Sequence, residues 1–276
     1  MATINAADVA KLRRVTLAGM MDCKKALEES DGNFDKAIEI IREKGQAVAN
    51  KRADREATEG VVLAKVTSNG KLGVITVLNS ETDFVAKNAK FQELANKIID
   101  IALAKNPADL EALKALPMEG GSVGGKIIEF VGIIGEKLEL SYFEKIEAAR
   151  VQAYIHPGNR LATIVGFTKA DLDMQVYKDV AMQVAAMNPV AVDKADVPGK
   201  IVAQELEIGR EQARLDGKPE EMLDKIAQGK LGKFFKESTL LNQEFVKDNK
   251  QTIGQYLKSV DKDLSVTGFR RFTLNL

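Results

Sequence analysis

Several residue types that support common chemistries are nearly absent from this 276-residue chain. It contains one cysteine, Cys23, one histidine, His156, and no tryptophan. A disulfide within the chain is therefore excluded, and so is a zinc site built from cysteine and histidine. The serine–histidine and cysteine–histidine routes to nucleophilic catalysis are excluded as well, unless His156 serves as the base.

The charge balance and the scarcity of aromatic residues argue against direct binding to nucleic acid. The chain has 40 basic and 40 acidic residues, a formal net charge of +0, and only 5% aromatic residues. A basic footprint over the whole chain is thus not expected, and nucleic-acid bases would find few rings on which to stack. We expect no direct nucleic-acid contact.

Long apolar runs are missing too. No run reaches the roughly 18–20 residues that a membrane-spanning helix needs, and the opening stretch MATINAADVAKLRR has no apolar core of a signal peptide. With 45% hydrophobic and 29% charged residues, the composition is that of an ordinary globular protein. We therefore expect a cytoplasmic protein that makes no membrane contact.

The first 45 residues predict three short helices joined by short loops. Apolar residues recur at helical spacing over 6–14, over 22–29 and again from Phe34 onward. Asn33 is a suitable N-cap for the third helix and Gly45 a suitable C-cap. A compact three-helix module is predicted, and the small, charged stretch that follows it is typical of a linker or an exposed helix.

A pattern of strand, turn, strand and helix occurs twice in the remaining chain. The first copy, VVLAKVTSNGKLGVITVLNS, has an Asn69-Gly70 turn and precedes a helix over 86–105. The second copy, VQAYIHPGNRLATIVGFT, precedes a helix over 177–187. Both helices end at an Asn-Pro pair. We infer a duplicated unit with two antiparallel sheets, each covered by helix, which is an α+β fold.

The other segments complete a predicted division into domains. Residues 136–146 read as a strand, 198–235 as a helical hairpin, 252–260 as a helix and SVTGFRRFTL as a closing strand. The predicted domains are a three-helix module with its linker (1–55), a first core subdomain (56–146), a second core subdomain (147–197 and 236–276) and the inserted hairpin (198–235).

Three motifs carry a functional and a structural interpretation. The stretch GGSVGGK (120–126) nearly matches a phosphate-binding loop, but Ile127 replaces the required Ser or Thr, so a flexible glycine loop is favoured. His156 precedes a Pro-Gly turn and is typical of a surface histidine. Met20 and Met21 are adjacent and cannot both face a small core, so at least one should be exposed; partner binding and gap filling both remain open.

Phe84, in SETDFVAKN, lies between a strand-like apolar run and a helical apolar stripe. Extending the stripe of the following helix back by seven residues reaches Phe84, but Lys87 and Asn88 interrupt it with polar side chains. Thr82 or Asp83 would cap the helix and fix the direction of this corner. A core position and a presented aromatic wedge both fit this pattern.

Four segments, taken in order, resemble bacterial elongation factor Ts. They are AGMMDCKKAL (18–27), DGNFDKAIEIIREKG (31–45), ETDFVAKNAKF (81–91) and VTGFRRF (266–272). The resemblance implies a guanine-nucleotide exchange factor that acts by binding, not an enzyme, with no cofactor and no metal of its own. The implied partner is elongation factor Tu, in its GDP-bound and nucleotide-free states. The implied fold has a first module like ubiquitin-associated domains and a coiled-coil hairpin.

The resemblance also implies which residues touch the partner. Its TDFV stretch, inserted into the partner's nucleotide domain, would dislodge the bound magnesium ion, so that GDP leaves. The residues of this stretch are Thr82, Asp83, Phe84 and Val85. The further contact positions implied are Arg13, Met20, Met21, Lys24, Ile134, Gly135 and His156. The hairpin over 198–235 would form a homodimer contact, as in some members.

Two other classes of function remain open on the sequence. The first is a ubiquitin-associated-type binding module fused to an unrelated α+β domain, supported by DGNFDKAIEII, and it predicts that residues 1–55 bind ubiquitin. The second is an enzyme that uses His156 as its base, and it predicts that His156→Ala abolishes turnover of some substrate.

Overall fold

The computed structural model describes residues 4–16 and 18–274, and its helices and strands form an α+β fold, as predicted. The helices are α1 (Ala6–Thr16), α2 (Met20–Glu29), α3 (Phe34–Lys51), α4 (Asp83–Ala86), α5 (Ala89–Lys105), α6 (Leu110–Ala115), α7 (Val123–Ile134), α8 (Met174–Met187), α9 (Gly199–Leu215), α10 (Glu220–Ser238) and α11 (Ile253–Val260). The strands are β1 (Glu59–Val66), β2 (Leu72–Ser80), β3 (Pro117–Met118), β4 (Gly121–Ser122), β5 (Leu138–Glu147), β6 (Arg150–Ile155), β7 (Leu161–Phe167), β8 (Glu244–Phe245), β9 (Asp248–Thr252) and β10 (Val266–Thr273).

The chain divides into two compact units. The first contains the described residues of Met1–Leu63 and Thr76–Glu144 together with Leu274, and the second contains Ala64–Ile75 and Lys145–Thr273. Helices α1 to α7 therefore belong to the first unit and α8 to α11 to the second. The finer division into four domains stays a prediction. In the described ranges, no helix is both long enough and apolar enough to cross a bilayer.

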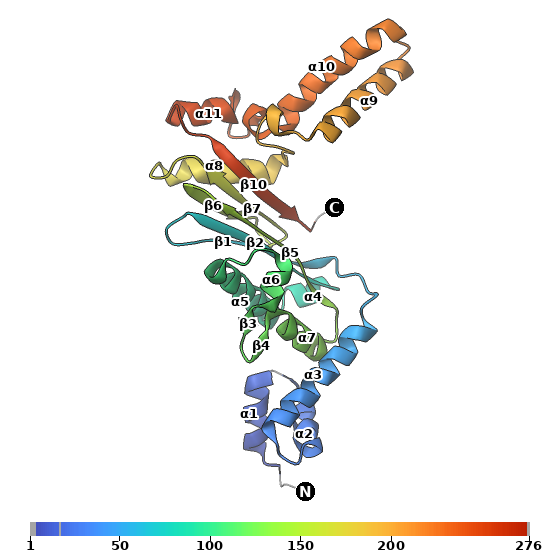
Figure 1. The fold of residues 1–276 in the computed structure, drawn as a ribbon, viewed down its shortest axis with the longest axis vertical. Coiled ribbons are helices and arrows are strands. Elements are labelled where there is room, and N and C mark those ends of the chain that lie inside the picture. The colour runs from blue at the N-terminus through green and yellow to red at the C-terminus, as the bar shows by residue number, and fades with distance from the viewer. Residues whose placement is uncertain (1–3, 17, 275–276) are drawn as a thin grey trace. The chain divides into compact units, whose positions relative to one another are not determined.

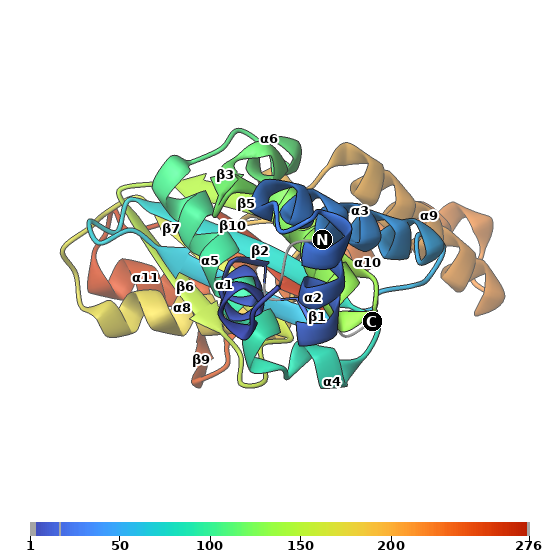
Figure 2. The same cartoon turned by 90° about the horizontal axis from the view of Figure 1, so that it is seen from below.

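The chain begins with the predicted three helices, α1, α2 and α3, which Figure 2 shows gathered together. Their small core is formed by Leu12, Ala18, Cys23, Ala26, Leu27, Ala37 and Ile41. Asn33 caps α3 as predicted, because its Oδ1 accepts a hydrogen bond from the backbone N–H of Lys36 at 3.1 Å. The likeness of this module to ubiquitin-associated domains stays a prediction.

The prediction that Gly45 ends the third helix is wrong, since α3 continues to Lys51 with Gly45 buried inside it. The glycine serves a close approach of two helices instead. A Cβ atom added at Gly45 would lie 3.0 Å from the carbonyl oxygen of Ile128 in α7, and one added at Gly132 would lie 2.7 Å from the Cα atom of Gly45. The two helices thus pack backbone to backbone at this point.

The glycine-rich stretch over 120–126 is not the flexible loop that its composition predicted. Ser122 caps α7, its Oγ accepting from the backbone N–H of Gly125 at 3.0 Å. The Nζ atom of Lys126 donates to Glu129 at 2.6 Å, and both side chains are buried. Glu129 also accepts from Nε of Arg42, in α3, at 2.9 Å. The positive charge of Lys126 is therefore paired with a carboxylate inside the protein, which argues against a phosphate site here.

The two predicted hairpins become two sheets with the same strand order. The sheets are β1-β2-β5 and β6-β7-β10, so each hairpin gains its third strand beside its second one. The helix after each hairpin ends alike. Asn106 has φ 46° and ψ 55°, Asn188 has φ 43° and ψ 56°, and each donates its N–H to the carbonyl four residues before it. These left-handed caps support the inferred duplication.

In the second unit, α8 covers the β6-β7-β10 sheet with a continuous apolar core. The core contains Val165 and Phe167 of β7, Tyr177, Val180 and Val184 of α8, and Ile253 and Leu257 of α11. The predicted helical hairpin is confirmed: α9 and α10 lie side by side (Figure 1) and are joined through Gly217, with φ 71°. Gly209 lets them approach, since a Cβ there would lie 3.0 Å from Cα of Ala227.

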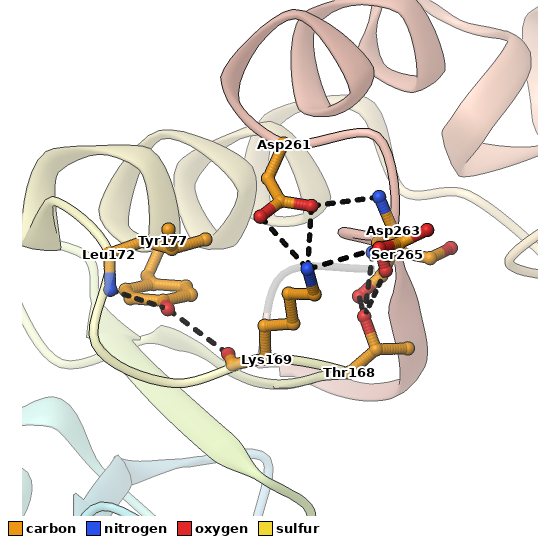
Figure 3. A network of polar contacts seen from close by, with 7 residues as sticks. All are labelled: Thr168, Lys169, Leu172, Tyr177, Asp261, Asp263 and Ser265. Atoms are coloured by element: carbon orange, nitrogen blue, oxygen red, sulfur yellow. Dashed lines mark hydrogen bonds and ion pairs between the residues drawn. The ribbon is translucent and has the colours of Figure 1, made fainter.

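A polar network joins the end of β7 to the segment before β10 (Figure 3). Nζ of Lys169 donates to both carboxylate oxygens of Asp261, at 2.8 and 2.9 Å, and to Asp263 at 3.3 Å. This hydrogen bonding raises the pKa of Lys169 and lowers that of Asp261. The hydroxyl of Tyr177 donates to the carbonyl of Lys169 at 3.0 Å. The network therefore fixes how the added strand β10 meets β7.

We predict that Gly132→Ala destabilises the first unit by about 1–3 kcal/mol, because the new methyl group must displace the α3 backbone. Gly229→Ala in α10 is the matched control. Its methyl group meets nothing within 4 Å, so helix propensity should raise stability by about 0.5–1 kcal/mol. Urea unfolding followed by circular dichroism measures both changes, and equal midpoints for the two variants would contradict the packing argument.

Candidate functional site

The helix predicted over 86–105 is α5, which starts three residues later, and a separate one-turn helix, α4, lies just before it. The one-turn helix α4 ends at Ala86, and α5 starts at Ala89, capped by Asn88, whose Oδ1 accepts from the backbone N–H of Lys90 at 2.9 Å. The predicted apolar stripe of α5 is buried at Phe91, Leu94, Ala95, Ile98 and Ala102. Phe84 stands on the separate turn and does not share that stripe.

Phe84 is 81% exposed, so the core position left open by the sequence is wrong. Thr82, and not Asp83, caps the turn, with its Oγ1 accepting from the backbone N–H of Val85 at 3.4 Å. Asp83 starts the turn and pairs with Lys87 at 2.6 Å, which lowers the pKa of Asp83. A large aromatic side chain is thus presented to solvent on a capped turn between β2 and α5.

A hollow of about 480 Å³ lies beside Phe84. Phe84, Val85, Phe130, Ile133 and Ile134 are among its lining residues, so the structure brings α4 and the end of α7 together. α7 ends at Ile134 and is capped by Gly135, whose φ of 78° suits glycine and whose N–H donates to the carbonyl of Val131 at 2.8 Å. The exposed ring and the hollow together form an apolar surface suited to contact with another protein.

Two carboxylates support this corner, and sequence reasoning missed both of them. Glu136 accepts from the backbone N–H of Thr82 at 3.1 Å and from its hydroxyl at 2.8 Å. Glu81 accepts from the backbone N–H of Lys137 at 2.6 Å and from Arg52 at 2.9 Å. Burial favours the neutral form of Glu81, but these hydrogen bonds outweigh burial and lower its pKa. No spacing in the sequence marks either residue.

The contact residues predicted in the first module all lie on its surface. Met20 and Met21, in the first turn of α2, are 61% and 63% exposed, which excludes gap filling and confirms that at least one is exposed. Arg13 and Met20 line one shallow hollow of about 550 Å³, and Lys24 is exposed beside its partner Glu28. Cys23, which lies between Met21 and Lys24 in the sequence, is fully buried, and burial raises the pKa of its thiol.

His156 belongs to the second unit, whereas every other predicted contact residue belongs to the first. It follows β6 in the predicted Pro-Gly turn and is exposed. Its Nδ1 lies 3.0 Å from the hydroxyl of Tyr154. Over residues 4–16 and 18–274, no group of three or more His, Cys, Asp or Glu side chains is arranged to hold a metal ion.

Known proteins resemble this chain over nearly its whole length. A family model described as Elongation factor TS matches residues 81–275. The elongation factor Ts of Porphyromonas gingivalis is 55% identical over 269 residues, which cover 97% of each chain. That of Flavobacterium psychrophilum is 50% identical over 275 residues, covering 99% of this chain and 100% of the relative. That of Cytophaga hutchinsonii is 49% identical over 278 residues, covering 100% of each.

The lowered pKa of Glu81 predicts how stability depends on pH. Its stabilising contribution is complete above the ordinary glutamate pKa of about 4.3 and is lost as the pH falls through the lowered value. Glu81→Gln should therefore cost about 1–3 kcal/mol near pH 7, and the gap from wild type should narrow below about pH 4. Thermal unfolding across this range tests the prediction.

Glu139→Gln is the control, because Glu139 is half-exposed and lies 3.6 Å from Nζ of Lys137. It should change stability by less than about 1 kcal/mol at every pH. A gap between wild type and Glu81→Gln that stays constant on acidification would contradict the assigned role of the Glu81 carboxylate.

Proposed function

This chain belongs to the elongation factor Ts family, and from that premise we propose that it is the guanine-nucleotide exchange factor of elongation factor Tu. The observation that carries the proposal is Phe84, an aromatic side chain left 81% exposed on a braced turn. Exposing so large an apolar group forgoes about 1.5–3 kcal/mol that burial would contribute, and contact with a partner would recover it.

Exchange follows from differential binding. The protein binds the GDP-bound partner, and the TDFV residues Thr82 to Val85 enter the partner's nucleotide domain. The ring of Phe84 wedges apart a helix region of that nucleotide domain, and the magnesium ion bound by the partner is displaced. Without that ion the phosphate charge of GDP is poorly neutralised, so GDP leaves and GTP can rebind. Because coupling is reciprocal, a factor that prefers the nucleotide-free partner necessarily weakens GDP binding.

The other exposed residues supply binding without chemistry. Met20 and Met21 offer flexible apolar contacts, with Arg13 and Lys24 as charged neighbours, for a second grip on the nucleotide domain. Ile134 lines the hollow beside Phe84, and Gly135 follows it as the C-cap of α7. His156 contacts the third domain of the partner. The protein thus needs no cofactor and no metal of its own, and it acts by binding and not as an enzyme.

The helical hairpin α9–α10 is the proposed contact for a homodimer. Ile208, Leu215 and Met222 on it are 40%, 84% and 46% exposed. Apolar side chains at such exposure favour association through this element. We place the protein in the cytoplasm, where translation elongation takes place, without direct contacts to nucleic acid or membrane.

Phe84→Ala should lower the rate at which the protein releases GDP from elongation factor Tu by about 10–100-fold, because the lost ring is worth about 1.5–3 kcal/mol once it is buried in the partner. Circular dichroism and thermal unfolding should be unchanged, since the ring is exposed. The measurement is stopped-flow release of fluorescent GDP. Val246→Ala is the control, because Val246 is 51% exposed and lies outside the proposed contacts.

The outcomes separate the alternatives. Full activity of Phe84→Ala would move the mechanism to other contacts. No acceleration by the wild-type protein would overturn the exchange function and favour the binding-module hypothesis, which ubiquitin binding would then test.

A further inference from the structure

Two chain segments beside Phe84 exchange hydrogen bonds in a reciprocal pattern. The carboxylate of Glu81 accepts a hydrogen bond from the backbone N–H of Lys137, at 2.6 Å, and the carboxylate of Glu136 accepts one from the backbone N–H of Thr82, at 3.1 Å. Each segment thus supplies one acidic side chain and, one residue further along, one backbone donor. We call this arrangement of residues 81–82 and 136–137 the carboxylate clasp.

The clasp fixes Thr82, the residue that caps the one-turn helix α4. Both the N–H and the hydroxyl of Thr82 donate to Glu136, and the carbonyl of Thr82 accepts from Oγ of Ser80 at 2.9 Å. Ser80 is fully buried. The cap's own bond to Val85 is 3.4 Å long and therefore weak. The orientation of the turn thus depends more on the carboxylate of Glu136 than on the cap itself.

A third chain segment joins the clasp. Arg52, the residue after α3, donates to both carboxylate oxygens of Glu81 at 2.9 and 3.0 Å. Nζ of Lys137 donates to the carbonyls of Ala53 and Arg55, each at 3.0 Å. These bonds therefore hold three segments together: the end of α3, the corner before α4 and the segment after α7. The guanidinium of Arg52 is the cation beside the Glu81 carboxylate.

We propose that Glu81 and Glu136 are positioning residues for Phe84. These two carboxylates contact neither the nucleotide nor the magnesium ion of the partner. They hold the turn so that the ring of Phe84 has one orientation before the partner binds. Preorganisation lowers the ordering cost that binding would otherwise incur. The inference rests on the proposed exchange function, because only that function gives the orientation of the ring a consequence.

The test is stopped-flow release of fluorescent GDP from elongation factor Tu, measured as a double-mutant cycle. Glu136→Gln keeps the shape of the side chain and removes its charge, and it should lower the rate about tenfold or more. Combined with Phe84→Ala, the same change should have almost no further effect, because no ring remains to be positioned. Glu139→Gln, on the neighbouring strand β5, is the matched control and should leave the rate unchanged.

The cycle separates positioning from simple support of the fold. A structural role would lower the rate by the same factor with and without Phe84, and that result would overturn the inference while the exchange function stands. Glu81→Gln gives an independent cycle through the other half of the clasp, should Glu136→Gln fail to fold. No acceleration by the wild-type protein would overturn the exchange function, and the inference with it.

Discussion

The close contact between α3 and α7 is the constraint on which the first unit depends. Gly45 and Gly132 let the two backbones meet, and a methyl group at either position would lie within 3.0 Å of the facing helix. Glu129 reinforces the contact by pairing with Arg42 across it. Since α7 ends at Ile134, this contact relates the module that carries Met20 and Met21 to the surface that carries Phe84.

An exposed aromatic ring binds a partner at a lower ordering cost when its direction is set in advance. The structure meets this condition through polar groups, because the turn α4 buries only Ala86 and has little apolar packing of its own. Charge-assisted hydrogen bonds from Glu136 and Glu81 take the place of a core at this corner. Such bonds can hold a turn firmly while its outer face remains free for a partner.

Family membership and the arrangement of the surface favour the same function. An enzyme that uses His156 gains no support from its surroundings, where the exposed ring lies next to the hydroxyl of Tyr154. A ubiquitin-type module alone would not account for the exposed Phe84 in a different part of the first unit. An exchange factor accounts for both exposed surfaces, because it must hold its partner at one place and distort it at another.

Short-range chemistry determined what the sequence alone could predict. The Asn33 cap, the two Asn-Pro helix ends, the hairpins and the buried stripe of α5 each depend on residues close together in the chain. The TDFV segment was identified by its resemblance to the family. Only the tertiary structure decided that α3 runs through Gly45, that α7 forms where a glycine loop was expected, and that Glu81 and Glu136 hold the corner next to Phe84. The contact at Gly45 and the bonds of Glu81 and Glu136 join residues more than 50 positions apart, as Thr82 and Glu136 are separated by 54 positions, and local patterns carry no record of such a partner.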